Sequence, residues 1–247
     1  MVNLIKKLYK NFFKLNINYQ QPKKINKDLI NAAQNGDLVL VQSLVKQGVD
    51  IHTNDDEAVR WAAEFGHLGV VKYLVENGAD IHAENDYALR WTSYRGQLEI
   101  VKYLVEKGAD IHANHDHALN LSSYSGHLKI VKYLIEHGAN IHAKDNAALR
   151  WAAENGHLEV VKYLVEKGAD IHADKDYVLK NASTNEHIKV IQYLLYDCYM
   201  KIKKETKDWL IEKNKKEVLQ LIEKRDLLFK LDKNLKNNHS VNTKNKI

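Results

Sequence analysis

Apolar positions in this chain recur with a 30-residue period, and each recurrence has helical spacing. In one segment Leu98, Val101, Leu104 and Val105 follow one another at intervals of three, three and one. Residues three and four apart share one face of an α-helix, so the pattern predicts an amphipathic helix in every segment. The leucines at the best-kept phase are Leu44, Leu74, Leu104, Leu134, Leu164 and Leu194. A helix is therefore expected once in every period.

Two columns of glycine have the same period and mark where helices end. Glycine tolerates the left-handed backbone conformation that commonly terminates a helix. We therefore expect a short first helix to end at one column and a second, apolar helix to end at the other. The first column is Gly36, Gly66, Gly96, Gly126 and Gly156, and the second is Gly48, Gly78, Gly108, Gly138 and Gly168. Each period thus predicts a helix–turn–helix unit.

An Asp or Asn opens each unit, at the position expected for a helix N-cap whose side chain accepts a backbone N–H. These residues are Asn26, Asp56, Asp86, Asp116, Asn146 and Asp176. A unit as short as this one cannot bury its own apolar face and has to stack on its neighbours. The predicted fold class is therefore an all-α repeat solenoid with short turn connections.

The period divides the chain into four predicted parts. Residues 1–25 carry apolar side chains at helical spacing and are predicted to form an N-terminal helical cap. Residues 200–235 are predicted to be a degenerate repeat or a helical C-terminal cap, and the polar, basic residues 236–247 a disordered tail. The six repeats between them are expected at 26–55, 56–85, 86–115, 116–145, 146–175 and 176–199.

The second half of the unit carries a family resemblance. Its consensus G-H-L-x-V-V-K-Y-L-V-x-x-G-A-D-I-H-A resembles the second half of the ankyrin repeat, and G-A-D-I-H-A is complete at 78–83, 108–113 and 168–173. The resemblance covers about residues 26–199 and implies helix–turn–helix units joined by β-hairpin-like fingers. Ankyrin units usually have 33 residues and begin with Thr-Pro-Leu-His, whereas this chain has Tyr87-Ala88-Leu89-Arg90. We therefore expect a blunted turn in place of the finger.

The 30-residue form, in a chain rich in Lys, Asn and Ile, also resembles ankyrin arrays encoded by giant DNA viruses of protists. Charge is distributed unevenly along it. Residues 1–25 carry six lysines and no acid, and residues 200–247 carry 14 basic and 7 acidic side chains, which leaves a net charge of −8 on the repeats. A nucleic-acid binder would be expected to place positive charge along its structured face. Contact with nucleic acid or an anionic membrane is therefore predicted only through the basic ends.

Candidate chemistry is sparse. Histidines recur in two columns, but neighbours within a column are one repeat apart, roughly 8–10 Å, whereas zinc ligands lie ~2.0–2.1 Å from the metal. The histidine after the first glycine is expected instead to tie loops of successive repeats, as the ankyrin resemblance implies. The chain has no G-x-S-x-G, P-loop or H-E-x-x-H motif. We expect no enzyme, no cofactor, no metal and no small-molecule substrate.

Cysteine usage and hydropathy suggest a compartment. The lone Cys198 favours either a reducing environment or a protein that is indifferent to redox conditions. No stretch approaches the ~20 apolar residues of a membrane span, and the N-terminus lacks the apolar core of a secretory signal. We expect an intracellular, cytoplasmic monomer that is not secreted.

The candidates for partner contact are residues at positions that vary between repeats whose other positions keep the same residue type. They gather at the end of the first helix, at positions that the resemblance places in the concave groove of ankyrin arrays. Aromatic residues and arginine are the side chains most often found at binding hot spots. The recurring tryptophans Trp61, Trp91 and Trp151 fit either packing between helices or partner contact. The predicted partner-binding residues are Arg60, Glu64, Phe65, Arg90, Tyr94, Arg95, Tyr124 and Arg150.

The sequence therefore predicts a non-enzymatic interaction module that binds another protein on its concave face. Two alternatives stay open. The basic ends favour a binder of anionic membrane or nucleic acid, and the C-terminal helices favour an adaptor that recruits a second protein.

Overall fold

The structure, a computed structural model, describes the backbone of residues 22–244 and the side chains of residues 26–233. Over this range the chain forms 14 α-helices and one π-helix, and no strand. The predicted all-α stack of helix pairs is confirmed. The chain divides into two compact units, Met1–Asp110 and Ile111–Ile247, which are described in turn.

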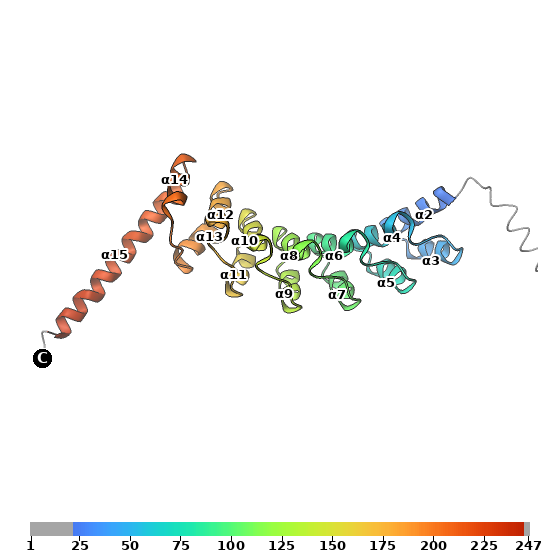
Figure 1. Cartoon of the computed structure of the whole chain (residues 1–247), viewed down its shortest axis with the longest axis horizontal. Helices are drawn as coiled ribbons and strands as arrows, with labels where there is room; N and C mark the ends of the chain where they lie inside the picture. The colour runs from blue at the N-terminus through green and yellow to red at the C-terminus, as the bar shows by residue number, and fades with distance from the viewer. Residues whose placement is uncertain (1–21, 245–247) are drawn as a thin grey trace, which may run out of the picture. The chain divides into compact units, whose positions relative to one another are not determined.

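The first unit contains three helix pairs. The first helices α2, α4 and α6 lie side by side in one row, and the second helices α3, α5 and α7 form another row (Figure 1). Leu29, Leu74, Leu89 and Leu104 are completely buried between the rows. The helices are α2 (Pro22–Asn35), α3 (Leu38–Lys46), α4 (Thr53–Glu64), α5 (Leu68–Glu76), α6 (Ala83–Arg95) and α7 (Leu98–Glu106).

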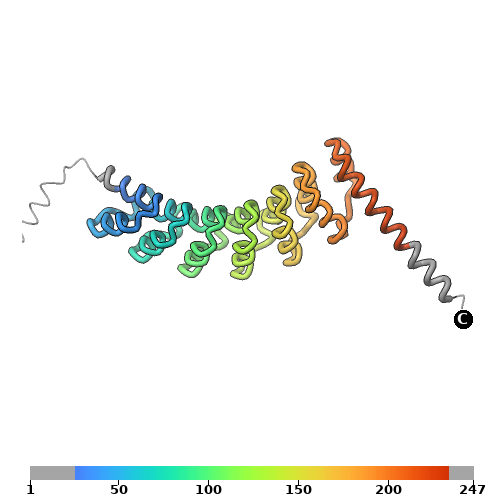
Figure 2. The backbone as a smooth tube through the Cα atoms, turned by 180° about the vertical axis from the view of Figure 1, so that it is seen from behind, coloured from blue at the N-terminus to red at the C-terminus, as the bar shows by residue number. Residues whose placement is uncertain are grey.

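The second unit contains four helix pairs in the same arrangement. Its first helices are α8, α10, α12 and α14, each packed on the next, and its second helices α9, α11, α13 and α15 do the same (Figure 2). The helices are α8 (Ala113–Tyr124), α9 (Leu128–Glu136), α10 (Ala143–Glu154), α11 (Leu158–Glu166), α12 (Ala173–Thr184), α13 (Ile188–Gln192) with the π-helix η1 (Tyr193–Asp197), α14 (Lys204–Glu212) and α15 (Lys216–Lys244).

Both glycine columns lie where the sequence predicts helix ends. Gly96 directly follows α6 with a φ of 82°, and Gly108 follows α7 with a φ of 96°. The first column has a second reason to be glycine. A Cβ atom on Gly156 would lie 2.5 Å from Nδ1 of His187 in the next repeat. That histidine's Nε2 lies 2.8 Å from the carbonyl oxygen of Glu154, so the predicted tie between loops is confirmed.

The described ends differ from the prediction. Helix α2 begins at Pro22, four residues before the expected first repeat, because proline is well suited to the first turn of a helix. Residues 1–21 of the expected N-terminal cap lie outside the described residues. The sequence predicts a disordered tail over 236–247, whereas the structure assigns 236–244 to α15, which runs as far as Lys244. No glycine or proline occurs between 216 and 244 to end that helix.

The C-terminal pair α14–α15 contacts the sixth repeat as one repeat contacts another. Lys215 Nζ donates to the carbonyl oxygen of Thr184 at 3.2 Å, at the place where His187 bonds Glu154. Thr206 Oγ1 donates to Asp176 Oδ2 at 2.6 Å. These contacts favour the degenerate repeat over a simple cap, and the division of the chain into domains stays a prediction.

The expected N-caps have a different role. Asp86 has a left-handed backbone (φ 55°) and ends a run of three such residues that begins at Glu84. Its Oδ1 accepts the backbone N–H of Asp110, 24 residues on, at 2.8 Å. The prediction that these side chains cap their own first helix is therefore wrong. Asp56, Asp86, Asp116 and Asn146 bind the backbone of the following connection instead, and the predicted blunted turn is a left-handed helical turn.

Candidate partner-binding surface

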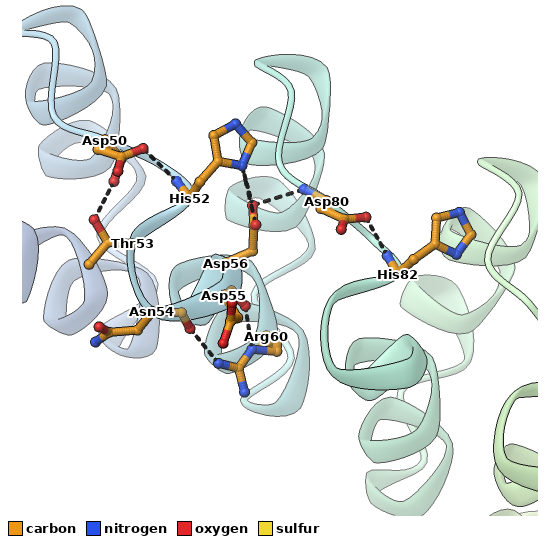
Figure 3. Close-up of polar contacts among 9 residues, drawn as sticks. All are labelled: Asp50, His52, Thr53, Asn54, Asp55, Asp56, Arg60, Asp80 and His82. Carbon is orange, nitrogen blue, oxygen red and sulfur yellow. Dashed lines mark hydrogen bonds and ion pairs between the residues drawn. The ribbon is translucent and has the colours of Figure 1, made fainter.

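Each left-handed turn is held by side chains from both of its ends. In the first unit, His52 Nδ1 lies 3.1 Å from Asp56 Oδ1, and the same oxygen accepts the backbone N–H of Asp80 at 2.8 Å (Figure 3). The Asp80 side chain in turn accepts the N–H of His82 at 2.8 Å, which is an Asx-turn. Left-handed residues other than glycine each cost ~1–2 kcal/mol, and this network offsets that cost.

The recurring arginines complete the same turns. Arg60 donates through Nε to the carbonyl oxygen of Asp55 at 2.9 Å and through Nη2 to that of Asn54 at 2.7 Å (Figure 3). Arg90 makes the equivalent pair of bonds one repeat later. In the second unit, Arg150 Nη2 donates to Lys144. Three of the predicted partner-binding residues therefore have a scaffold contact that explains their recurrence.

Glu64 is the centre of the first-helix face in the first unit. It is only 6% exposed, yet both carboxylate oxygens are bound by side chains of the next repeat. Arg95 Nη2 donates to Oε1 at 2.8 Å, and the Tyr87 hydroxyl donates to Oε2 at 2.8 Å. Glu64 thus joins α4 to α6 and fixes the position of the Arg95 guanidinium, whose side chain is 47% exposed. The hydrogen bond to Glu64 raises the pKa of Arg95.

Tyr87, which the sequence analysis did not single out, lies between two arginines. The guanidinium carbons of Arg60 and Arg90 are 5.3 and 5.8 Å from its ring centroid, within the range of a cation–π contact. Burial, followed by the hydrogen bond to Glu64, raises the pKa of Tyr87 to about 12. The hydroxyl therefore stays protonated at neutral pH and donates to Glu64. Tyr87 lies near the start of α6, at a repeat position whose residue type varies along the chain. This variation was the signal in the sequence that could have identified it.

Aromatic side chains cover the rest of this face. The Phe65 ring lies 5.8 Å from Trp61 and is 44% exposed. Tyr94 meets the edge of Trp91 at 5.4 Å, and the guanidinium of Arg95 lies 5.7 Å from the Tyr94 ring. Trp61 and Trp91 are half-buried, so they both pack between helices and support the exposed rings. The structure thus brings together Glu64, Phe65, Tyr94 and Arg95.

The other two predicted residues lie in the second unit. Tyr124 is 41% exposed and meets the edge of Trp151 at 6.1 Å. Arg150 is mostly buried and donates through Nη1 to Asp174 Oδ2 at 3.0 Å. Both belong to first helices, α8 and α10, that pack on each other.

A groove that the sequence did not predict runs between α2 and α4. Its volume is about 550 Å³, and amide side chains such as Asn31, Gln34 and Asn54 line it together with Ile30 and Trp61. The sequence had marked two of the residues that line this groove: Gln34 belongs to the variable end of a first helix, and Trp61 belongs to the tryptophan column. The groove extends the exposed first-helix face of the first unit toward α2.

Other chemistry is limited in the part of the chain that the structure describes. There, no three His, Cys, Asp or Glu side chains are grouped so that they could hold a metal ion. Likewise, none of the described helices is both long and apolar enough to cross a membrane. Histidines of one column tie successive repeats together. For example, burial lowers the pKa of His157, whose Nε2 lies 2.8 Å from the carbonyl oxygen of Tyr124.

Comparison with protein-family models gives matches along most of the chain. A model of three ankyrin repeats matches residues 2–85, 29–115 and 83–145, and a model of many ankyrin repeats matches residues 149–195. The chain belongs to the ankyrin repeat family. Ankyrin repeats generally mediate protein–protein interactions and are typically binding modules without enzymatic activity. No curated protein matches the chain, so its likeness to viral ankyrin arrays stays a prediction from the sequence.

Proposed function

We propose that this ankyrin repeat protein binds a partner protein on the first-helix face of its repeats, the face that is concave in ankyrin arrays. The observation that carries the proposal is the contrast between fixed and variable positions. The positions that hold the turns and tie the repeats carry similar side chains throughout. The ends of the first helices instead present Phe65, Tyr94, Arg95 and Tyr124.

The exposure of these side chains supports the proposal. Phe65 and Tyr124 are among the few large hydrophobic residues of the repeats that are more than two-fifths exposed. Each is supported by a half-buried tryptophan, so little side-chain freedom remains to be lost on binding. We further propose that Arg60, Arg90 and Arg150 hold their turns rather than contact the partner, and that Glu64 positions Arg95.

A paired capture experiment tests this function. The full chain and the variant Phe65→Ala/Tyr94→Ala/Arg95→Ala/Tyr124→Ala are used as baits, and bound proteins are quantified by mass spectrometry. A matched control variant changes exposed positions of the second helices, Val39→Ala/Glu99→Ala/Lys129→Ala/Lys189→Ala. We expect a partner that the wild type and the control retain and the first variant loses, with unchanged helicity and melting. Equal retention by all three baits would remove the proposed surface.

A second candidate, an adaptor function, is favoured by the C-terminal helices. Ile211 on α14 and Leu227, Leu228 and Leu231 on α15 are each at least half exposed, an arrangement typical of interaction sites. Removal of residues 227–247 should then release a different set of captured proteins and leave the first set bound. If the truncation instead abolishes binding to anionic vesicles or nucleic acid, the alternative based on the basic ends is favoured.

A further inference from the structure

The first unit offers a fixed cation in one repeat and an exposed aromatic ring at the same position of the preceding repeat. Phe65 and Arg95 occupy the same position in successive repeats, and Glu64, the neighbour of Phe65, is hydrogen-bonded to Arg95. We propose that this part of the face recognises a partner segment in which a carboxylate stands close to an apolar side chain. Arg95 would bind the carboxylate and Phe65 the apolar group. The inference rests on the proposed function and adds the chemistry of the partner.

The contact with Glu64 holds Arg95 in place and leaves other N–H donors of its guanidinium available. A guanidinium has five N–H donors in a rigid plane, and the contact with Glu64 uses Nη2 alone. The side chain is 47% exposed and lies against the Tyr94 ring at 5.7 Å. A planar, positioned guanidinium with remaining exposed donors suits bidentate binding of a carboxylate.

Two acids next to this site, Glu64 and Glu57, are already engaged. Glu64 accepts from Arg95 and Tyr87, and Glu57 accepts from Trp61 Nε1 at 2.8 Å and from Asn54 Nδ2 at 2.7 Å. These hydrogen bonds lower the pKa of Glu57, so it remains ionised. Both carboxylates are therefore held by donors of this chain and do not depend on a donor from the partner. An incoming carboxylate would therefore find the exposed donors of Arg95 without competition from these two acids.

The apolar half of the site is Phe65. Its ring is 44% exposed and is oriented by Trp61, at 5.8 Å and an interplanar angle of 39°. An aromatic ring held by a second ring provides contact area at low entropic cost. The corresponding positions of the second unit are Ser125, Asn155 and Asn185, which supply neither a cation nor an apolar ring. The preference for a carboxylate should therefore depend on Arg95.

Unbiased peptide display tests the inference. A phage library of random peptides is panned against the full chain and, for subtraction, against the variant Phe65→Ala/Tyr94→Ala/Arg95→Ala/Tyr124→Ala. We expect enriched peptides to carry Asp or Glu within a few residues of Phe, Trp or Leu. In fluorescence polarisation, Arg95→Gln should weaken the best acidic peptide by roughly tenfold or more. The same substitution should barely affect that peptide when its acid is replaced by the amide, whereas Phe65→Ala should weaken both peptides.

The outcomes separate the two proposals. If no peptide is enriched over the subtracted variant, both the proposed function and this inference fail. If peptides depend on Phe65 but carry no acid, or carry basic residues, the inference alone fails. Arg95→Gln leaves the buried Glu64 without its cation, so the double variant Glu64→Gln/Arg95→Gln provides a neutral pair as a check on folding effects. Asn185→Ala in the second unit should leave peptide affinity unchanged.

Discussion

Each of the two units joins successive first helices through a glutamate at the same repeat position, but with different partners. In the first unit Glu64 is bound by the cation of Arg95 and the hydroxyl of Tyr87. In the second unit Glu154 Oε2 accepts the amide of Asn181 at 2.9 Å, and its backbone oxygen accepts Asn185 Nδ2 at 3.0 Å. The joint lies at the same repeat position, but the carboxylate is bound by a cation in the first unit and by an uncharged amide in the second.

The difference shows which positions of the repeat are free to vary. The turn networks and the histidine ties recur in both units because they connect one repeat to the next. The residues that donate hydrogen bonds to the glutamate differ between the units, and they lie on the first-helix face. The same fold can therefore present a cation beside an aromatic ring in one unit and amides in the other. The following substitutions test this separation between scaffold and face.

The largest effect is expected at the scaffold oxygen that holds each turn. Asp86→Ala would leave the backbone N–H of Asp110 and the ring of His82 without an acceptor. Asn146→Ala would do the same to Asp170 and His142. Because unsatisfied buried groups are costly, each variant should lose about 2–4 kcal/mol in the free energy of unfolding measured by urea denaturation.

The amide at 146 supplies the control for the acid at 86. Asp86→Asn should stay within about 1 kcal/mol of wild type, since an amide oxygen accepts the same bonds. Burial is the main cause that raises the pKa of Asp86 above its ordinary 3.8, so the folded state favours the protonated form. Its contribution to stability is then greatest below pH 3.8 and is lost as pH rises through the raised pKa. The free energy of unfolding of Asp86→Asn, relative to that of the wild type, should therefore increase as pH rises. An increase toward acid pH instead would contradict this assignment.

A smaller effect, which depends on the side chain facing each glycine, is expected at the first glycine column. Gly156→Ala and Gly66→Ala share the cost of a positive φ, ~1–2 kcal/mol for a residue with a Cβ. At Gly156 the new Cβ would also lie 2.5 Å from the His187 ring, whereas at Gly66 it would lie 2.7 Å from the flexible amide end of Gln97. Gly156→Ala should thus cost about 1 kcal/mol more than Gly66→Ala in thermal or chemical unfolding.

A double-variant cycle checks the cause. His187→Ala removes the clash, so it should be less costly in the Gly156→Ala background than in the wild type. Equal costs in the two backgrounds would show that φ alone explains the glycine.

A still smaller difference in the free energy of unfolding is expected between substitutions of the two glutamates. Glu64→Gln replaces an ionic contact with a half-exposed arginine, which solvent screens, so a loss of about 1 kcal/mol is expected. Glu154→Gln should lose less than about 0.5 kcal/mol, since its amide oxygen accepts from Asn181 equally well. Urea denaturation of both variants measures the gap, and about 1 M salt should narrow it. A gap that salt leaves unchanged would argue against an ionic origin.

The parts of the fold that follow from local periodicity were predictable from the sequence. The spacing of Leu98, Val101 and Leu104 specifies an amphipathic helix, and the glycine columns specify its ends. The tie made by His187 was anticipated from the family resemblance. The helices and their ends depend on local spacing, whereas the tie joins residues 33 apart and was predictable only because it recurs in the family's repeats.

The turn and part of the site were not predictable in the same way. An Asp at the start of a helix usually caps it, and only the contact between Asp86 and the distant backbone N–H of Asp110 reveals the other role. Arg60 and Arg90 were predicted to contact a partner because arginine is common at interfaces, and we propose a scaffold role for them from their bonds to the turn. Their exact recurrence with the turn was the signal for a scaffold role. Phe65 and Arg95, which do not recur, kept the status of candidates because nothing in the repeat requires them.

The smallest effect on folding, and the sharpest contrast between the units, is expected at the exposed rings. Phe65→Ala and Tyr124→Ala each remove a side chain more than two-fifths exposed, so each should change the free energy of unfolding by about 0.5 kcal/mol or less. Their effects on partner capture should differ, because the repeat after Phe65 carries the fixed cation Arg95 at the same position, whereas the second unit has Ser125, Asn155 and Asn185 there. Titration of a captured partner against both variants measures this directly. If Tyr124→Ala weakens binding as much as Phe65→Ala does, the second unit shares the contact, and the ionic joint at Glu64 does not distinguish the binding unit from the other.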